Sequence, residues 1–218
     1  MTVKKEDAGQ FFNGYAGQFD EIYMLQKQRG LVGWLNRRLR ASMLIRYQRT
    51  FEALDTIEGR SVLDVGCGSG RFLVECLLRG ATDVAGIDLS PEMLSLSEKA
   101  IQANNISAER AVLMNGDFQA QSFDRQYDYA IVMGVMDYIE TPDAFLKKLS
   151  GVVRRKATIS FPVSESVWRF QRKLRYKLRG CPLYFYTKES VDQLLKQSGF
   201  EKYSIERIQR DYFVTAWH

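Results

Sequence analysis

Short apolar runs alternate with stretches of helical spacing through the middle of the chain, between residues 61 and 161. Runs of this length that end at polar or glycine-rich turns are typical of buried parallel strands, and the stretches between them predict helices on both faces of a sheet. The strands expected here are 61–64, 83–88, 111–114, 127–133 and 156–161. Near the end of the chain, the same reasoning predicts a helix over 188–198, capped by Thr187, and strands over 199–207 and 210–217.

The most informative turn follows the first of these strands. Gly66, Gly68 and Gly70 occupy alternate positions before a helix that should begin near Arg71. Glycines in such a turn let backbone N–H groups approach a ligand closely. A dinucleotide fingerprint would place its third glycine at Arg71, and no lysine follows as it would in a phosphate-binding loop. Asp64 at the strand end suits a ligand that carries an ammonium or sulfonium cation.

A second carboxylate ends the next strand. Asp88 lies 18 residues after Gly70, where it can accept hydrogen bonds from ribose hydroxyls, each contributing about 1.5–3 kcal/mol. Ser90 is the expected cap of the following helix, with Pro91 in its first turn. Alternatively, Asp88 is an ordinary strand-end residue in an exposed loop. Its spacing from the turn favours the ligand-binding interpretation.

With these glycines and carboxylates the chain resembles the class I S-adenosylmethionine-dependent methyltransferases, whose first motif is Asp/Glu-x-Gly-x-Gly-x-Gly. The strand at 127–133 is similar to the family's Tyr/Phe-Asp-x-Val/Ile pattern. The resemblance implies an α/β, Rossmann-like sheet of seven strands, mostly parallel with an antiparallel last strand, and S-adenosyl-L-methionine as cofactor. The residues it implies as cofactor contacts are Tyr15, Asp64, Gly66, Gly68, Gly70, Asp88, Leu89, Met93, Asp117, Phe118 and Met133.

The resemblance also implies a role for several of these residues. Asp117 would accept from the adenine amino group while Phe118 covers the ring, although Asn-Gly and Gly-Asp are also ordinary turn dipeptides. Leu89 would pack on an adenine face, and Met133 would line the cleft. Tyr15 would contact the methionine end of the cofactor; a core aromatic is an equally good interpretation.

Composition agrees with one α/β domain. A chain of 218 residues can bury a full core with little left for a second domain. No apolar run approaches the ~18–20 residues that span a bilayer, and the first residues have no apolar signal-peptide segment. Three cysteines without metal-ligand spacing favour packing roles in a reducing compartment. We therefore expect a cytoplasmic protein without a metal site, with peripheral contact with a membrane as an open alternative.

Two basic, amphipathic segments flank the expected acceptor opening. We expect residues 1–55 to form a helical cap, with one or two helices in 27–49, and residues 56–218 to form the methyltransferase domain with an insert at about 164–185. The basic segment 164–180 is compatible with a solvated helix, a lid over an anionic or lipophilic acceptor, or a membrane-surface helix. This layout is similar to that of the magnesium-protoporphyrin and quinone-ring methyltransferases.

The catalytic residues are less defined. The single histidine, His218, ends the chain and is expected to be exposed or frayed, so Asp137 and Tyr138 are the candidates for acceptor positioning or proton transfer. Net charge +5 favours an anionic small-molecule acceptor. A cofactor-binding protein without turnover, an NAD-dependent oxidoreductase and an RNA-directed methyltransferase are the alternatives. The oligomeric state is open.

Overall fold

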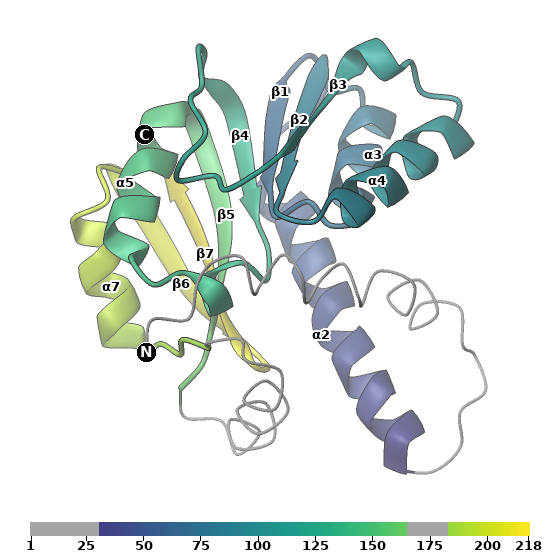
Figure 1. Cartoon of the computed structure of the whole chain (residues 1–218). Helices are drawn as coiled ribbons and strands as arrows, with labels where there is room; N and C mark the ends of the chain where they lie inside the picture. Colours follow the sequence, from purple (N-terminus) through teal and green to yellow (C-terminus); the bar gives the residue numbers. More distant parts are fainter. Residues whose placement is uncertain (1–30, 165–182) are drawn as a thin grey trace.

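Seven strands pair into one sheet in the computed structural model of the chain (Figure 1). The structure describes residues 31–164 and 183–218, with side chains from Ser42 onward. The strands are β1 Ser61–Val65, β2 Asp83–Asp88, β3 Ala111–Asn115, β4 Tyr127–Val132, β5 Val153–Pro162, β6 Lys202–Ile208 and β7 Asp211–Trp217. Their order is β3-β2-β1-β4-β5-β7-β6, and β7 is antiparallel to both neighbours while all other pairs are parallel. The expected seven-stranded, Rossmann-like sheet is confirmed.

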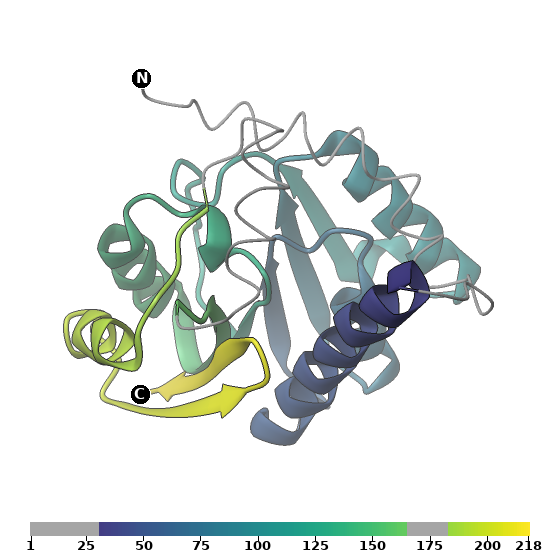
Figure 2. The same ribbon diagram turned by 90° about the horizontal axis from the view of Figure 1, so that it is seen from below.

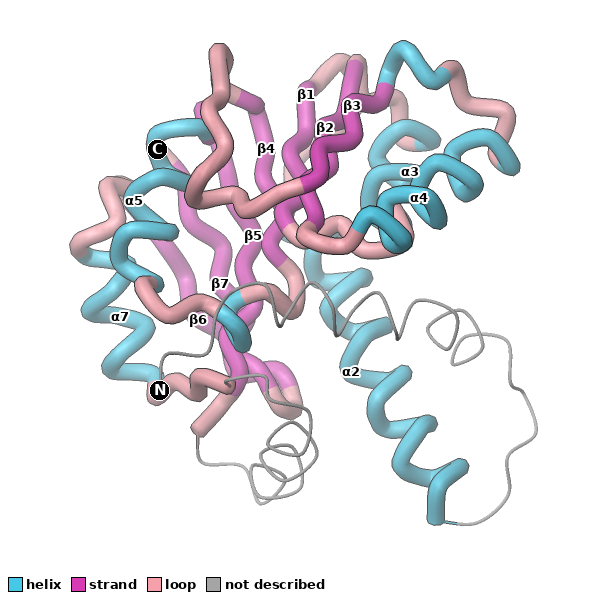
Figure 3. Tube along the Cα trace, viewed as in Figure 1, coloured by secondary structure: helices cyan, strands magenta, loops and turns pink. Residues whose placement is uncertain are grey.

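Helices cover the sheet on both faces, as the views in Figures 2 and 3 show. The described helices are α2 Leu31–Ala53, α3 Arg71–Leu78, α4 Pro91–Ala103, α5 Pro142–Val152 and α7 Lys188–Lys196, with short 3-10 helices η1 Ala108–Arg110 and η2 Met136–Tyr138. One apolar cluster joins α5 and α7 to the sheet, and the other joins α3, α4 and the end of α2 to its opposite face. No helix in the described ranges is long and apolar enough to cross a bilayer.

Alternation along β1 shows how the strands feed both clusters. Val62 packs with Leu73 of α3, whereas Leu63 belongs to the cluster of Phe145 on α5, because successive side chains of a strand point to opposite faces. Cys67 and Cys76 are buried on the α3 side, and burial raises the pKa of both thiols. A thiol with a raised pKa is a poor nucleophile, which supports the packing role expected for these two residues.

Parallel register places the functional turns at one edge. Asp64 near the end of β1 pairs with Gly86 of β2 and with Ile131 of β4, so these strands end together. The strand order reverses between β1 and β4, and ligands of open α/β sheets bind in the crevice at such a reversal.

Two elements differ from the apolar pattern. The strand expected at 156–161 begins earlier, at Val153, because Arg154 and Arg155 are exposed and form ion pairs with Asp128 instead of interrupting the strand. The basic segment expected to hold one or two helices forms one continuous helix in its described part, α2. Tyr15 and the segment 165–182 lie outside the described residues, and the division into residues 1–55 and 56–218 stays a prediction.

The turn between β1 and α3 generates a stability prediction. Gly59 and Gly70 both have left-handed φ, 69° and 79°, which costs a side-chain-bearing residue about 1–2 kcal/mol. A Cβ at Gly70 would also lie 2.8 Å from Ser97 Oγ, whereas nothing lies within 4 Å of one at Gly59. We expect Gly59→Ala to lower the free energy of unfolding in urea by about 1 kcal/mol and Gly70→Ala by about 2–4 kcal/mol. Equal losses would show that Ser97 moves aside without cost.

Candidate functional site

The glycine-rich turn is tied to the neighbouring strand. Gly66 and Cys67 both donate their N–H groups to the Ile87 carbonyl, at 2.7 and 3.2 Å. Gly66 has φ 71° and a Cβ there would collide with Val135, so the turn and the loop after β4 are in close contact. No side chain caps the N-terminus of α3, which starts at Arg71. The turn therefore presents backbone donors at the crevice.

Asp88 is held rigidly by backbone amides. Its Oδ2 accepts from Gly68 N at 2.9 Å and its Oδ1 accepts from Ser90 N at 2.9 Å. Burial raises the pKa of this carboxyl, against the opposing effect of the amide donors. Ser90 in turn caps α4, accepting from Met93 N at 3.1 Å, as the sequence predicts. An ionised carboxylate has about four acceptor positions, so Asp88 keeps capacity to accept from a hydroxyl group of a ligand.

Asp64 is the unusual charge of the site. It is 1% exposed, and its Oδ2 has no hydrogen-bond partner among the described residues. Burial, and then the negative charge of Asp88, raise the pKa of this carboxyl well above its ordinary value. A buried carboxylate without a partner is costly, and a cation beside it would remove much of that cost. This orphaned oxygen makes the crevice suitable for the cationic end of a ligand.

The loop after β3 closes the far side of the crevice. Gly116 N and Asn115 Nδ2 both donate to the Asp88 carbonyl, at 3.0 and 3.1 Å, which joins this loop to β2. Asp117 Oδ1 accepts from Gln119 N at 3.0 Å. Leu89 is unusual among large apolar residues because 37% of it is exposed, which leaves its surface available to a flat ring.

The Phe118 side chain is more buried than is expected of a residue that packs on the adenine ring of a ligand. It is 4% exposed, and its ring packs 4.9 Å from Phe145 and 5.5 Å from Phe123, measured between centroids. It therefore belongs to the core beneath the loop. Met93 is also buried, at 2% exposure, and supports the start of α4 from within.

The loop after β4 lies against the glycine-rich turn through Val135. Gly134 donates its N–H to Ser160 Oγ of β5 at 2.8 Å, and Met133 is half-buried against the α3 cluster. Ser160 was not anticipated from the sequence; a serine near the end of a buried strand is the only signal for it. Asp137 is 2% exposed, and its carbonyl accepts from Tyr184 N at 2.8 Å. Tyr138 is half-buried.

The single histidine is remote from this edge. His218 follows β7 at the opposite end of the sheet, where its N–H donates to the Arg155 carbonyl and its ring lies 5.1 Å from that of Phe200. It is exposed, as expected, but it is not frayed. The crevice therefore contains no histidine base, since the chain has no other histidine.

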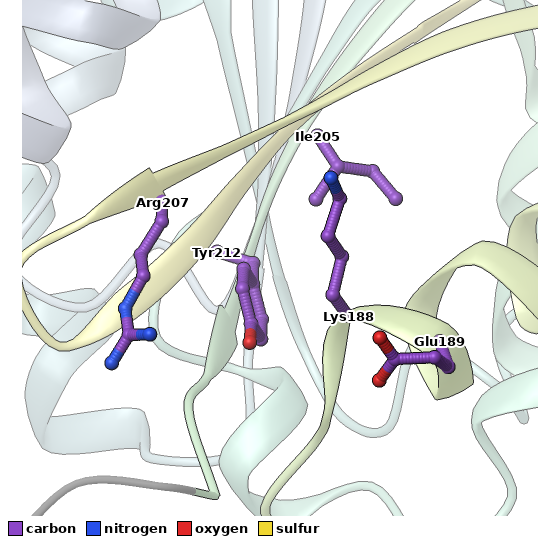
Figure 4. Close-up of a pocket in the computed structure, with 5 residues that line it drawn as sticks. All are labelled: Lys188, Glu189, Ile205, Arg207 and Tyr212. Atoms are coloured by element: carbon purple, nitrogen blue, oxygen red, sulfur yellow. The ribbon is translucent and has the colours of Figure 1, made fainter.

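A surface pocket lies elsewhere, between α7 and the β6–β7 hairpin (Figure 4). Its volume is about 280 Å³, and its lining residues are Lys188, Glu189, Ile205, Arg207 and Tyr212. None of them is an expected cofactor contact, and their charges are mixed. The geometry of the glycine-rich turn is the better guide to function.

Comparison with known proteins agrees with this geometry. A family model described as a methyltransferase domain matches residues 62–156. The magnesium protoporphyrin IX methyltransferase from Synechocystis PCC 6803, solved with bound SAH, superposes with a TM-score of 0.74 at 18% identity, over 98% of this chain and 99% of that one. Residues 62–156 thus match a methyltransferase domain, and the chain has the fold of solved S-adenosylmethionine-dependent methyltransferases.

Curated methyltransferases match over shorter regions. The ribosomal protein L11 methyltransferase of Xanthomonas axonopodis pv. citri (strain 306) is 35% identical over 82 residues, which is 38% of this chain and 27% of that protein. The ubiquinone biosynthesis O-methyltransferase of Acinetobacter baumannii (strain ACICU) is 30% identical over 105 residues, 48% of this chain and 44% of that protein. The matches thus span less than half the length of these relatives.

Within this methyltransferase fold, the structure brings together the first-motif residues and Asp88 as the sequence predicts. Asp64, Gly68 and Asp88 meet at one turn, and Leu89 is exposed beside them. Their contacts with S-adenosyl-L-methionine remain predictions, as do those of Gly66, Gly70, Asp117, Met133 and Tyr15 and of the buried Met93 and Phe118.

The pKa of Asp64 predicts a pH effect on the stability of the ligand-free protein. Because the folded state raises this pKa above 3.8, it binds the proton more tightly than the unfolded chain does. The resulting stability is present at low pH and is lost as the pH rises through the folded pKa. Asp64→Asn avoids that loss. The free energy of unfolding in urea of the variant, relative to that of wild type, should therefore increase as the pH is raised from about 4 to 7. A gap that is constant with pH would contradict the assignment.

Proposed function

We propose that the protein transfers a methyl group from S-adenosyl-L-methionine to a small-molecule acceptor that is anionic or lipophilic. The observation that carries the proposal is the pair of carboxylates at the glycine-rich turn. Asp88 is fixed by two amides to receive hydroxyl donors, and Asp64 is buried with an oxygen that lacks a partner. A ribose and a cationic methionine end would satisfy these two groups.

The residues of this chain would bind the cofactor and align its methyl group with the acceptor. When bound, the cofactor brings a methyl group that is already activated by the sulfonium. Asp88 would hold the ribose hydroxyls and Asp64 would balance the positive end, while the Gly134 amide is fixed by Ser160 at the loop that faces the acceptor. Alignment of this kind can be worth an effective molarity of about 10⁵–10⁸ M.

Two observations support a small acceptor. The superposition over nearly the whole chain is with an enzyme named for magnesium protoporphyrin IX, and several curated relatives are named for ubiquinone biosynthesis. The basic segments 27–49 and 164–180 would cover an acceptor of negative charge, and could also bring the protein to an anionic membrane surface. Asp137 and Tyr138 stay the candidates for acceptor positioning, Asp137 from a buried position.

Calorimetry with a matched pair of variants tests the cofactor. Asp88 and Asp83 stand at opposite ends of β2, and Asp83 is ion-paired with Arg125 away from the turn. We expect wild type and Asp83→Asn to bind S-adenosylmethionine and S-adenosylhomocysteine alike, and neither to bind NAD. Asp88→Asn should bind at least about tenfold more weakly, the cost of losing charge-assisted hydrogen bonds.

The same experiment separates the alternatives. Absence of binding by wild type, or undiminished binding by Asp88→Asn, would refute the cofactor assignment, and binding of NAD would favour an oxidoreductase. Formation of S-adenosylhomocysteine when the protein is incubated with a metabolite extract distinguishes an enzyme from a protein that binds the cofactor without turnover.

A further inference from the structure

Arg46 lies against the backbone of the loop that follows β4. A Cβ placed on Gly134, two residues beyond β4, would be 3.2 Å from Arg46 Nη1. Gly134 has φ 76°, so both its conformation and the guanidinium favour glycine at this position. The next residue, Val135, touches Gly66 of the glycine-rich turn. The guanidinium is therefore one loop residue away from the expected cofactor site.

The β6–β7 hairpin holds this arginine in place. Arg46 Nε lies 3.6 Å from Asp211 Oδ2, at the first residue of β7. Ser42, one turn earlier on α2, donates its hydroxyl to the same oxygen at 3.4 Å. Asp211 is 3% exposed, and the Arg46 side chain is 18% exposed. A partly desolvated arginine with a buried partner is well ordered for binding.

Two nitrogens of the Arg46 guanidinium have neighbours in the described part of the chain. Its Nε side faces Asp211, and its Nη1 faces Gly134 at the loop after β4. Within residues 42–164 and 183–218, whose side chains are described, Asp211 is the carboxylate recorded within ion-pair distance of this side chain. Arg49, one turn further along α2, differs because it pairs with both Glu52 and Glu206. Arg49 thus serves to attach the helix to β6, whereas the Arg46 guanidinium lies beside Gly134 in the loop after β4.

We propose that Arg46 binds a carboxylate group of the acceptor, so that the acceptor is a small carboxylic acid. This inference rests on the proposed methyl transfer and adds the chemistry by which the acceptor is recognised. A guanidinium edge matches the planar carboxylate with two parallel hydrogen bonds. Because Asp211 already offsets part of the positive charge, a dianionic phosphate would be poorly compensated here, which favours a monoanion.

Binding of acids and their uncharged amides tests this role. The probes are aromatic and aliphatic monocarboxylates, each paired with its primary amide, titrated into the full chain saturated with S-adenosylhomocysteine. We expect at least one acid to bind wild type about 10- to 100-fold more tightly than its amide, as charge-assisted bidentate contacts do. Arg46→Gln should bring that ratio close to one, and Arg46→Lys should keep only part of it.

Arg49→Gln is the matched control, since it removes the neighbouring arginine of the same helix and should leave the acid-to-amide ratio unchanged. An arginine that only attached α2 would change melting temperature without changing this ratio. The proposal is overturned when no acid is preferred by wild type, or when Arg46→Gln keeps the preference. Loss of S-adenosylhomocysteine binding in wild type would instead refute the proposed function, and this inference with it.

Discussion

A buried carboxylate without a full set of partners is the constraint around which the site is organised. Asp64 lies on the central strand between β2 and β4, so water cannot reach it and its charged form is penalised. The backbone around it supplies no compensation: the nearby amides of Gly66 and Cys67 donate to the Ile87 carbonyl, and that of Gly68 donates to Asp88. Such a group destabilises the folded protein when no ligand is bound, and a cationic ligand would offset this cost.

The long helix α2 connects this site to the far edge of the sheet. Tyr47 and Phe51 pack on Phe72 of α3, beside the glycine-rich turn, with ring centroids 5.5 and 5.9 Å apart. On another face the same helix pairs through Arg49 with Glu206 of β6. One rigid element is thus fixed both to the cofactor half and to the hairpin, and this double attachment determines where Arg46 lies.

The structural role of a residue is best predicted from the sequence when it depends only on residues close by in the chain. Gly66, Gly68 and Gly70 are recognisable because each adopts a left-handed φ, and Ser90 because it caps a helix beside it. Such features depend on neighbours within a few residues, so spacing alone reveals them.

Features that depend on distant parts of the chain were not predictable in the same way. Arg46 stands among several basic residues of one helix, and only Asp211, far along the chain, distinguishes it from Arg49. Phe118 has the spacing of a residue that covers adenine, yet its contacts with Phe145 and Phe123 place it in the core. The start of β5 was likewise missed, because two charged residues, Arg154 and Arg155, do not look like part of a buried strand. Their partner Asp128 lies on the neighbouring strand and cannot be identified from local sequence.

The proposed site has unlike charged groups at its two ends. The turn contributes Asp64 and Asp88, while the other end holds the Arg46 guanidinium of α2, beside Gly134 and paired with Asp211 of β7. Val135, which touches Gly66, stands between them. If the cofactor and the acceptor bind as proposed, the cationic end of the cofactor lies at the turn and the acceptor carboxylate lies at Arg46. Their reacting groups would then meet at the loop after β4, where the Ser160 hydroxyl fixes the Gly134 amide.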